Sequence, residues 1–220
     1  VANFYEDEPF PNYDKINSRK EIKNAAEVGQ YSKALFDLIP IGGKCLEIGC
    51  GTGQLTNYLG LKENISVIGM DLSKKSLEMA AKFKMENSIH NTTFVRADLF
   101  DHPFHKEIFD VVIANGVLHH TIDTWRALEK VATLVKKNGY AVIGLYNIYG
   151  RWRTNLLRQF SNVLGRKFLK IIEPMKNKKQ NVNTMNSWIN DQYFHPLERS
   201  HTYDECLIQG EKLGLSVQRF

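Results

Sequence analysis

The sequence predicts an α/β fold built on a mostly parallel sheet, and three observations support this. Short apolar runs of strand length alternate with segments of helical periodicity from residue 44 to residue 146. The first run ends in a glycine-rich turn that opens a helix, KCLEIGCGTGQLT. A chain of 220 residues with 43% hydrophobic content suffices for one sizeable domain with an elaboration. Because strands and helices of these lengths are typically joined by right-handed crossovers, we expect one parallel sheet.

Residues 1–40 are expected to form an arm and a helix that cover the site. Residues 1–17 are rich in aromatic and acidic side chains, and their two prolines exclude a helix. The arm could fold over a cofactor or cover the core, and the covering role is favoured because aromatic residues usually provide burial. Ser18 and Glu21 form a capping box, and a helical period follows as far as Pro40.

Residues 41–146 are expected to form the cofactor-binding core. The predicted strands are 44–48, 65–70, 92–96, 109–114 and 140–146. The predicted helices are 54–59, stopped by Gly60, 74–86, capped by Ser73, and 124–137, capped by Asp123 and closed at Gly139.

The alternation stops after residue 146, so residues 147–200 are expected to form a helical lid or substrate insertion on the face that carries the site. Within it, residues 174–190 are polar and are expected to be mobile. Residues 201–220 should return to the core. A capping box of Thr202 and Glu205 starts a helix that ends at Gly214, and residues 215–220 are predicted as a strand.

Composition excludes several classes of protein. No apolar run approaches the length of about 20 residues that a membrane span requires, and the N-terminus does not resemble a secretory signal. The three cysteines lack Cys-x-x-Cys spacing, so we expect neither a disulfide nor a metal site, and a cytoplasmic location is the simplest inference.

The glycine turn and the strand ends supply candidate binding groups. Glycines can bring the backbone directly against a ligand, and Glu47, one residue before the turn, would face a positively charged group. The spacing differs from the dinucleotide pattern, which would need glycine at Gln54. Asp71 closes the second strand, where a carboxylate can accept from both hydroxyls of a ribose, and Asp98 closes the third.

Four segments in this order, LEIGCGTGQL, VIGMDLS, VRADL and FDVVIANGVLHH, resemble the successive motifs of class I S-adenosylmethionine-dependent methyltransferases. The resemblance covers roughly residues 30–146. It implies a Rossmann-like, doubly wound sheet with helices on both faces, S-adenosylmethionine as the cofactor, and in-line methyl transfer. That fold usually ends in an antiparallel strand pair, so the C-terminus is expected to be truncated by one strand.

The resemblance also assigns residues to the cofactor. Those implied to line its methionine part, with the first near the ammonium group, are Glu47, Gly49, Gly51, Gly53, Asn115 and Gly116. Asp71 would hold the ribose and Leu72 would pack on adenine. Asp98 would bond the adenine amino group, with Leu99 beside it. The alternative for both aspartates is ordinary turn chemistry at a strand end.

Candidate residues for the acceptor follow strands four and five. His119 and His120 could act as a base because histidine titrates near neutral pH, although a role in starting a helix or packing the core is favoured. The residues expected to line the acceptor pocket, or alternatively to form a structural turn, are Tyr146, Asn147, Tyr149 and Arg151. His195 and His201 are further candidates whose distance from the site is not fixed by chain order.

The basic charge is local, since residues 151–180 carry nine Lys or Arg against one acid, while the whole chain is +5. A lid helix with a solvated basic face is the favoured explanation, ahead of RNA or a lipid surface, and no RNA-binding module supports RNA. We therefore expect methyl transfer to O, N or C of a small molecule. The alternatives are an RNA- or lipid-directed methyltransferase and a non-catalytic cofactor-binding protein, and the glycine spacing disfavours a nucleotide-dependent oxidoreductase. Acceptor, methylated atom and oligomeric state stay open.

Overall fold

The computed structural model describes residues 9, 11, 13, 16–164, 169, 189, 192–195 and 197–218, without the side chains of 161–164. Most of the predicted arm, the lysine-rich part of the basic segment, nearly all of the predicted mobile stretch 174–190 and the last two residues lie outside this description.

A five-stranded sheet forms the centre of the molecule, and all of its strands are parallel. The strands are β1 (Lys44–Ile48), β2 (Ser66–Asp71), β3 (Thr92–Arg96), β4 (Phe109–Asn115) and β5 (Val135–Gly144). Their order is β3-β2-β1-β4-β5. The chain moves outward from β1 to β3 and then crosses back to β4, so strand order reverses between β1 and β4. Ligands bind at such a reversal, at the carboxyl ends of the strands.

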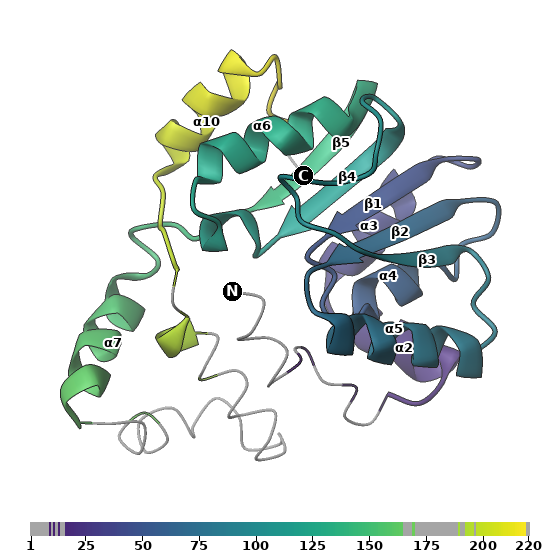
Figure 1. The fold of residues 1–220 in the computed structure, drawn as a ribbon, viewed down its shortest axis with the longest axis horizontal. Helices are drawn as coiled ribbons and strands as arrows, with labels where there is room; N and C mark the ends of the chain where they lie inside the picture. The colour runs from purple at the N-terminus through teal and green to yellow at the C-terminus, as the bar shows by residue number, and fades with distance from the viewer. Residues whose placement is uncertain are drawn as a thin grey trace.

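Helices cover both faces of the sheet, which confirms the predicted doubly wound α/β fold (Figure 1). The helices are α2 (Arg19–Glu27), α3 (Gln30–Leu38), α4 (Gln54–Leu59), α5 (Lys74–Glu86), α6 (Thr124–Leu134), α7 (Trp152–Leu164) and α10 (Tyr203–Lys212), with a short 3-10 helix, η1 (Leu118–His120). Three predicted caps are present, since the side chains of Ser18, Ser73 and Asp123 each accept a backbone N–H in the first helical turn.

The strand period of two separates two cores. Cys45 of β1 and Val111 of β4 face a core that α2, α3, α4 and α5 cover. Leu46 and Val112 face the opposite core, which α6 covers. Because the central strands β1, β2 and β4 are largely buried on both faces, the sheet holds its C-terminal edge rigidly and leaves that edge for a ligand.

The helical region after β5 is also present. Helix α7 lies apart from the sheet, at the lower left of Figure 1. Its residue Leu157 packs against a small separate core of Leu169, Ile189 and Tyr193. None of the helices in the described ranges has the length and hydrophobicity needed to cross a bilayer.

Three predicted boundaries were wrong. The single helix expected before Pro40 is two helices, because Gly29 takes an extended conformation (φ −105°, ψ 142°) and starts α3. Helix α6 ends at Leu134 instead of residue 137, and β5 starts at once with a buried Val135. Asn138 takes a positive φ of 63° where β5 bulges against β4, so the glycine that follows it belongs to the strand and not to a helix end.

The last predicted strand does not form over the described residues 215–218. Leu215 packs against the core that α6 covers, and its N–H bonds to the carbonyl of Gly210. The segment therefore contacts the core through side chains without joining the ladder of β5.

Candidate functional site

The glycine turn after β1 folds back onto the end of β2. The N–H groups of Gly49 and Cys50 both bond to the carbonyl of Met70, at 2.7 and 3.1 Å. Gly53 has φ of 74°, and a Cβ at this position would lie 2.6 Å from the Cβ of Ala80 in α5. Glycine is therefore needed here for backbone conformation and for close packing of α4 on α5. Gly53 stands behind the turn and does not line the cavity described below.

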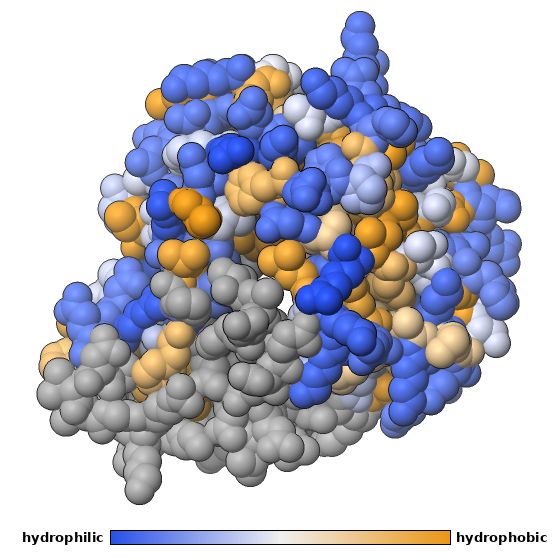
Figure 2. Space-filling view, viewed as in Figure 1, coloured by the Kyte–Doolittle hydropathy of each residue, from blue (hydrophilic) through white to orange (hydrophobic). Residues whose placement is uncertain are grey.

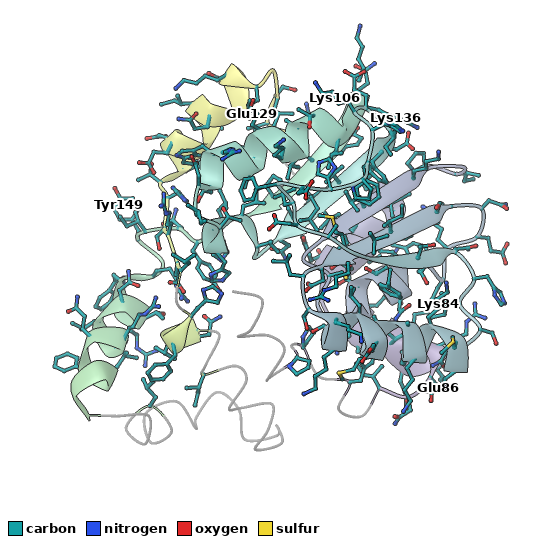
Figure 3. All side chains as sticks on the ribbon, viewed as in Figure 1. Lys84, Glu86, Lys106, Glu129, Lys136 and Tyr149 are labelled. Atoms are coloured by element: carbon teal, nitrogen blue, oxygen red, sulfur yellow. The ribbon has the colours of Figure 1, made fainter. Side chains whose placement is uncertain are left out.

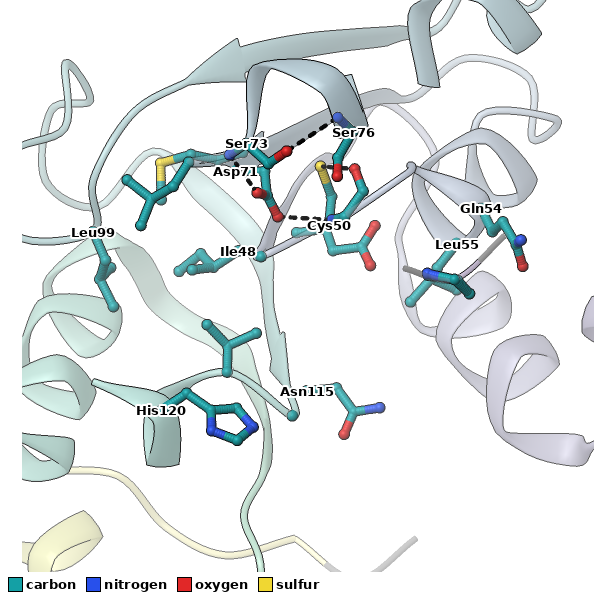
Figure 4. A pocket seen from close by; sticks show the side chains of 18 of the residues that line it. Ile48, Cys50, Gln54, Leu55, Asp71, Ser73, Ser76, Leu99, Asn115 and His120 are labelled. Carbon is teal, nitrogen blue, oxygen red and sulfur yellow. Dashed lines mark hydrogen bonds between the residues drawn. The ribbon is translucent and has the colours of Figure 1, made fainter. Parts of the chain in front are cut away.

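Asp71 is held at the end of β2 by two backbone groups. Gly51 N–H donates to its Oδ2 at 2.8 Å, and Ser73 N–H donates to its Oδ1 at 2.8 Å (Figure 4). A carboxylate oxygen can accept more than one hydrogen bond. The carboxylate is thus fixed in orientation beside the glycine turn, where it can accept hydroxyl groups from a ligand.

Glu47 carries a buried carboxyl next to this turn. The hydroxyl of Thr56 donates to Glu47 Oε2. Burial raises the pKa of Glu47 to about 8, the hydrogen bonds from Thr56 lower it, and the nearby Asp71 raises it slightly. A carboxyl with this pKa is largely protonated in the unliganded protein at neutral pH. A cation brought beside it would favour the ionised form.

The third and fourth strands bring the remaining predicted cofactor residues to the same edge. Asp98 accepts the N–H of Phe100 at 2.8 Å, in a turn, and Leu99 is buried beside it. Asn115 ends β4, and its side chain fills the space that a Cβ on Gly144 would need. The residues of these two strand ends that line the cavity are Asp98, Leu99, Asn115 and Gly116, and Leu72, directly after β2, lines it as well.

A cavity of about 850 Å³ opens at this edge, which is toward the upper end of the usual range of about 300–1,000 Å³ for ligand sites. Apolar residues gather toward the middle of the face shown in Figure 2, with hydrophilic residues around them. The acidic lining residues among the described positions are Glu47, Asp71 and Asp98, and these described positions include no lysine or arginine. Such a wall suits a ligand with positive charge and resists phosphates.

The N-terminal arm contributes to the wall. Pro11 and Ile16 line the cavity, and the hydroxyl of Thr52, in the glycine turn, donates to the carbonyl of Pro11. Tyr13 stacks on Phe83 of α5 with ring centroids 4.6 Å apart. The described arm residues therefore both border the cavity and cover the core, the two roles that the sequence left open.

The two adjacent histidines of η1 occupy different environments. His120 lines the cavity (Figure 4), and its Nδ1 lies 2.7 Å from the carbonyl oxygen of Leu197. Since a carbonyl only accepts, Nδ1 carries the hydrogen, and in neutral His120 Nε2 is the proton acceptor. This is the tautomer that a general base requires.

His119 is fully buried, and neither ring nitrogen has a hydrogen-bond partner among the described residues. Burial lowers its pKa to about 3, with smaller contributions from His120 and Arg151. Its ring centroid lies 3.9 Å from that of Tyr146. His119 is absent from the cavity wall, so its position fits the packing role that the sequence favoured over catalysis.

Of the four residues predicted to line the acceptor pocket after β5, only Tyr146 does so. Asn147 Oδ1 accepts the N–H of Tyr149 at 2.9 Å, which is turn chemistry. Tyr149 is 76% exposed and points outward (Figure 3). Arg151 is 7% exposed and bonds Glu198 through Nη2 at 2.7 Å to each oxygen. The alternative of a structural turn thus describes Asn147 and Tyr149, and Arg151 forms an ion pair in which both side chains are buried.

Residues without a sequence signal complete the wall. Tyr31 of α3, Thr121, Gln192 and Leu197 line the cavity, although none lies in a motif. His195 stacks on His120 with centroids 3.7 Å apart, so the insertion reaches the site. Over the described ranges, no group of three or more His, Cys, Asp or Glu side chains could hold a metal ion.

Comparisons with known proteins agree with this geometry. A family model described as a methyltransferase domain matches residues 46–143. The chain is 28% identical over 113 residues to the 27-O-demethylrifamycin SV methyltransferase of Amycolatopsis mediterranei, covering 50% of this chain and 42% of that protein. It is 30% identical over 132 residues to the ubiquinone biosynthesis O-methyltransferase of Vibrio vulnificus, covering 60% of this chain and 53% of that protein.

The solved structure of the YcgJ protein from Bacillus subtilis has the same fold. The superposition has a TM-score of 0.60 at 20% sequence identity and covers 86% of this chain and 70% of that chain. The chain spans about half the length of the curated relatives that it matches.

Proposed function

The chain belongs to the class I S-adenosylmethionine-dependent methyltransferase family, and on that premise we propose that it methylates a hydroxyl oxygen of an uncharged small molecule. One of the two curated relatives described above is named a 27-O-demethylrifamycin SV methyltransferase, and the other is named a ubiquinone biosynthesis O-methyltransferase. The observation that carries the oxygen assignment is His120 on the cavity wall. Its Nδ1 lies 2.7 Å from the carbonyl oxygen of Leu197 and therefore carries the hydrogen, so Nε2 is the ring nitrogen that can accept a proton in neutral His120.

The cavity residues fit the cofactor. The acids on the wall, Glu47, Asp71 and Asp98, suit a ligand that bears a sulfonium and an ammonium group. We assign Glu47 to the ammonium group, Asp71 to the ribose hydroxyls and Asp98 to the adenine amino group. The apolar contacts and backbone surfaces assigned to the same ligand are Gly49, Gly51, Leu72, Leu99, Asn115 and Gly116, with Gly53 supporting the turn from behind.

Bound S-adenosylmethionine supplies a methyl group on a positively charged sulfur, which is already activated for in-line displacement. The protein then has to orient the acceptor and exclude water. His120 Nε2 would accept the hydroxyl proton as the oxygen attacks, a contribution of typically about 10²- to 10⁴-fold for a positioned general base. The acceptor would lie between His120, Tyr146 and the insertion.

The proposed organisation follows the sequence prediction. Residues 1–40 cover the site, residues 41–146 bind the cofactor, residues 147–200 form the lid and substrate insertion, and residues 201–220 return to the core. An RNA acceptor gains no support from the cavity, because a phosphate would meet acidic side chains and no lysine or arginine among its described lining residues.

The test begins with the full chain, S-adenosylmethionine labelled on its methyl group, and a cell extract. Transfer of label to an uncharged small molecule supports the proposal, and label found only on RNA, protein or lipid overturns the acceptor class. Binding of S-adenosylhomocysteine without transfer to any fraction would favour a non-catalytic binding protein.

The base is tested with the labelled acceptor. We expect His120→Ala to lower kcat by about 10²-fold or more while the Kd of S-adenosylhomocysteine stays within about twofold. His105→Ala, which changes an exposed histidine in the loop before β4, is the matched control. An unchanged kcat in His120→Ala would remove the base from the mechanism.

A further inference from the structure

Helix α7 carries large apolar side chains on its outer side. Trp152, Leu156 and Phe160 are 66%, 45% and 50% exposed, and they recur every fourth residue along the helix. At about 100° of rotation per residue they lie within an arc of about 80°, so they form one stripe, which we call the outer stripe. The helix stands at the edge of the molecule, apart from the sheet (Figure 1). An apolar stripe that faces solvent in this way indicates an interaction surface.

Two arginines of this region point away from the outer stripe. Arg151, directly before α7, is buried in its ion pair with Glu198. Arg158 donates through Nη2 to the carbonyl of His195, and its Nη1 lies 3.7 Å from Glu198 Oε2. A surface helix normally turns its apolar side to the protein and its polar side to water. The solvated basic face that the sequence favoured therefore does not include these two arginines, and apolar side chains take the outer positions instead.

The turn that leads into α7 extends the exposed apolar surface. Ile148 and Tyr149 are both exposed. The backbone of this turn is held by hydrogen bonds, because Asn147 Oδ1 accepts the N–H groups of Tyr149 and Gly150 at 2.9 and 3.3 Å, and the N–H of Ile148 donates to the carbonyl of His201 at 3.1 Å. The apolar surface before the helix is therefore presented on a fixed backbone.

Charge distinguishes among the partners that such a surface could bind. The sequence from residue 151 to residue 180 carries nine Lys or Arg against one acid. A second copy of the chain would bring the same positive charge and would be repelled, whereas an anionic surface would be attracted. Trp and Tyr side chains are favoured at the headgroup level of a bilayer. An apolar stripe within a basic segment is the composition of a helix that lies in a membrane interface.

We propose that α7 lies on an anionic lipid bilayer, with Trp152, Leu156 and Phe160 placed between the headgroups and the acyl chains. Arg153 is exposed beside the outer stripe, where it faces the headgroups in this arrangement. The inference goes beyond the proposed function, because docking on a bilayer requires neither turnover nor a particular methyl acceptor.

The first test measures binding of the full chain to sedimented vesicles of phosphatidylcholine, with or without about 30% phosphatidylglycerol. We expect binding to the anionic vesicles. The partition coefficient should fall about tenfold or more when the anionic lipid is omitted, and also when salt is raised from about 0.1 M to about 0.5 M, because both changes weaken the attraction of the basic segment.

Substitutions in the outer stripe separate apolar insertion from charge alone. Leu156→Ser and Phe160→Ser should each lower the partition coefficient on anionic vesicles about tenfold, because each removes an apolar side chain from the lipid boundary. Met85→Ser, which removes an exposed apolar side chain from α5, is the matched control and should stay within about twofold. Thermal melts and an unchanged Kd for S-adenosylhomocysteine show that each variant is folded.

Trp152 reports on its own position in the bilayer. Bromine atoms on the acyl chains quench the fluorescence of a tryptophan that lies near them. We expect this quenching when the full chain binds anionic vesicles, and Trp152→Phe should lose most of it while its partition coefficient stays within about threefold, since Phe keeps most of the apolar surface.

Every other outcome overturns the inference. Binding that Leu156→Ser and Phe160→Ser leave unchanged would show adsorption through charge alone. In sedimentation velocity without lipid, a dimer that Phe160→Ser converts to a monomer would assign the outer stripe to a second copy of the chain. Binding neither to vesicles nor to a second copy would indicate a protein partner. Loss of cofactor binding would refute the proposed function and leave this inference untouched, so the two fail separately.

Discussion

The affinity for the cofactor is expected to depend on pH through Glu47. Burial raises the pKa of this carboxyl to about 8, so at pH 6 only about one molecule in a hundred carries it ionised, and at pH 8 about half do. If the ionised form receives the ammonium group of the cofactor, the Kd of S-adenosylhomocysteine should fall about 50-fold between pH 6 and pH 8. Two neighbours of Glu47 do not titrate in this window, because burial raises the pKa of the Cys50 thiol well above its ordinary value and the pKa of Tyr31 to about 12.

Unliganded stability should move in the opposite direction. The folded-state pKa of Glu47 lies above the ordinary value of 4.5 that the carboxyl has in the unfolded chain, so between these two values the native state binds more protons than the unfolded state. The contribution of Glu47 to stability is therefore lost as pH rises through about 8. A ligand cation at this carboxyl would restore stability at high pH.

The assay is isothermal titration of S-adenosylhomocysteine from pH 6 to pH 8.5, in two buffers with different ionisation enthalpies. Near pH 6 we expect about one proton released on binding, and about a quarter of a proton at pH 8.5. Two controls remove the effect: Glu47→Gln, and 5′-methylthioadenosine as the ligand, because it lacks the amino-acid group. A Kd that is flat from pH 6 to pH 8, or one that changes equally in Glu47→Gln, would refute the reasoning.

Three further predictions concern stability and can all be measured by urea unfolding. Burial lowers the pKa of His119 to about 3, so below pH 6.5 the unfolded state binds more protons than the native state. The free energy of unfolding should therefore fall by about 3–5 kcal/mol from pH 7 toward pH 3, and His119→Leu should make it less dependent on pH. Arg151→Ala leaves the 3% exposed Glu198 carboxylate with a longer contact to Arg158 Nη1, at 3.7 Å, and should cost about 3 kcal/mol. Part of the loss should be recovered by adding Glu198→Gln, and strict additivity of the two changes would contradict the coupling. Gly53→Ala should lower the free energy of unfolding by about 2–4 kcal/mol, because the new Cβ would clash with α5. Gly116 also has a positive φ, but a Cβ there would meet no atom within 4 Å, so Gly116→Ala should cost about 1 kcal/mol. Equal losses in the two variants would show that packing plays no part.

The sequence predicted the ends of helices correctly where the residues that stop or cap the helix lie within one turn of it. The capping box of Thr202 and Glu205 is formed as predicted, because both bonds close within one helical turn. Gly60 ends α4 at the predicted residue for the same reason. Such features need no information about the rest of the chain, so a local pattern is enough.

The boundary between α6 and β5 shows where local patterns fail. Leu134 and Val135 are both buried, and two adjacent apolar residues fit the end of a helix as well as the start of a strand. What decides between them is the pairing of Val135 with Phe109, which is a contact between distant parts of the chain. The sequence pattern contains no record of that register.

The candidate site divides along the same line. Strand-end positions such as Asp71 and Asp98 could be predicted because the carboxyl ends of parallel strands meet at one edge. Gln192 and Leu197 reach the wall from an insertion that starts after β5, and their placement depends on an ion pair between Arg151 and Glu198 across 47 residues of sequence. Charge pattern alone suggested a solvated basic face and gave no sign of this buried partner.

The acidic residues along the cavity wall affect which abundant metabolites can compete with the cofactor for the site. Adenosine triphosphate and the other adenine nucleotides share the nucleoside half of the proposed cofactor, so shape alone would admit them. Their phosphates would take the place of the methionine part of the cofactor, near the carboxylate of Asp71, where no lysine or arginine of the described lining would neutralise them. The wall thereby acts as a filter against its most plentiful competitors without any group built specifically to recognise them.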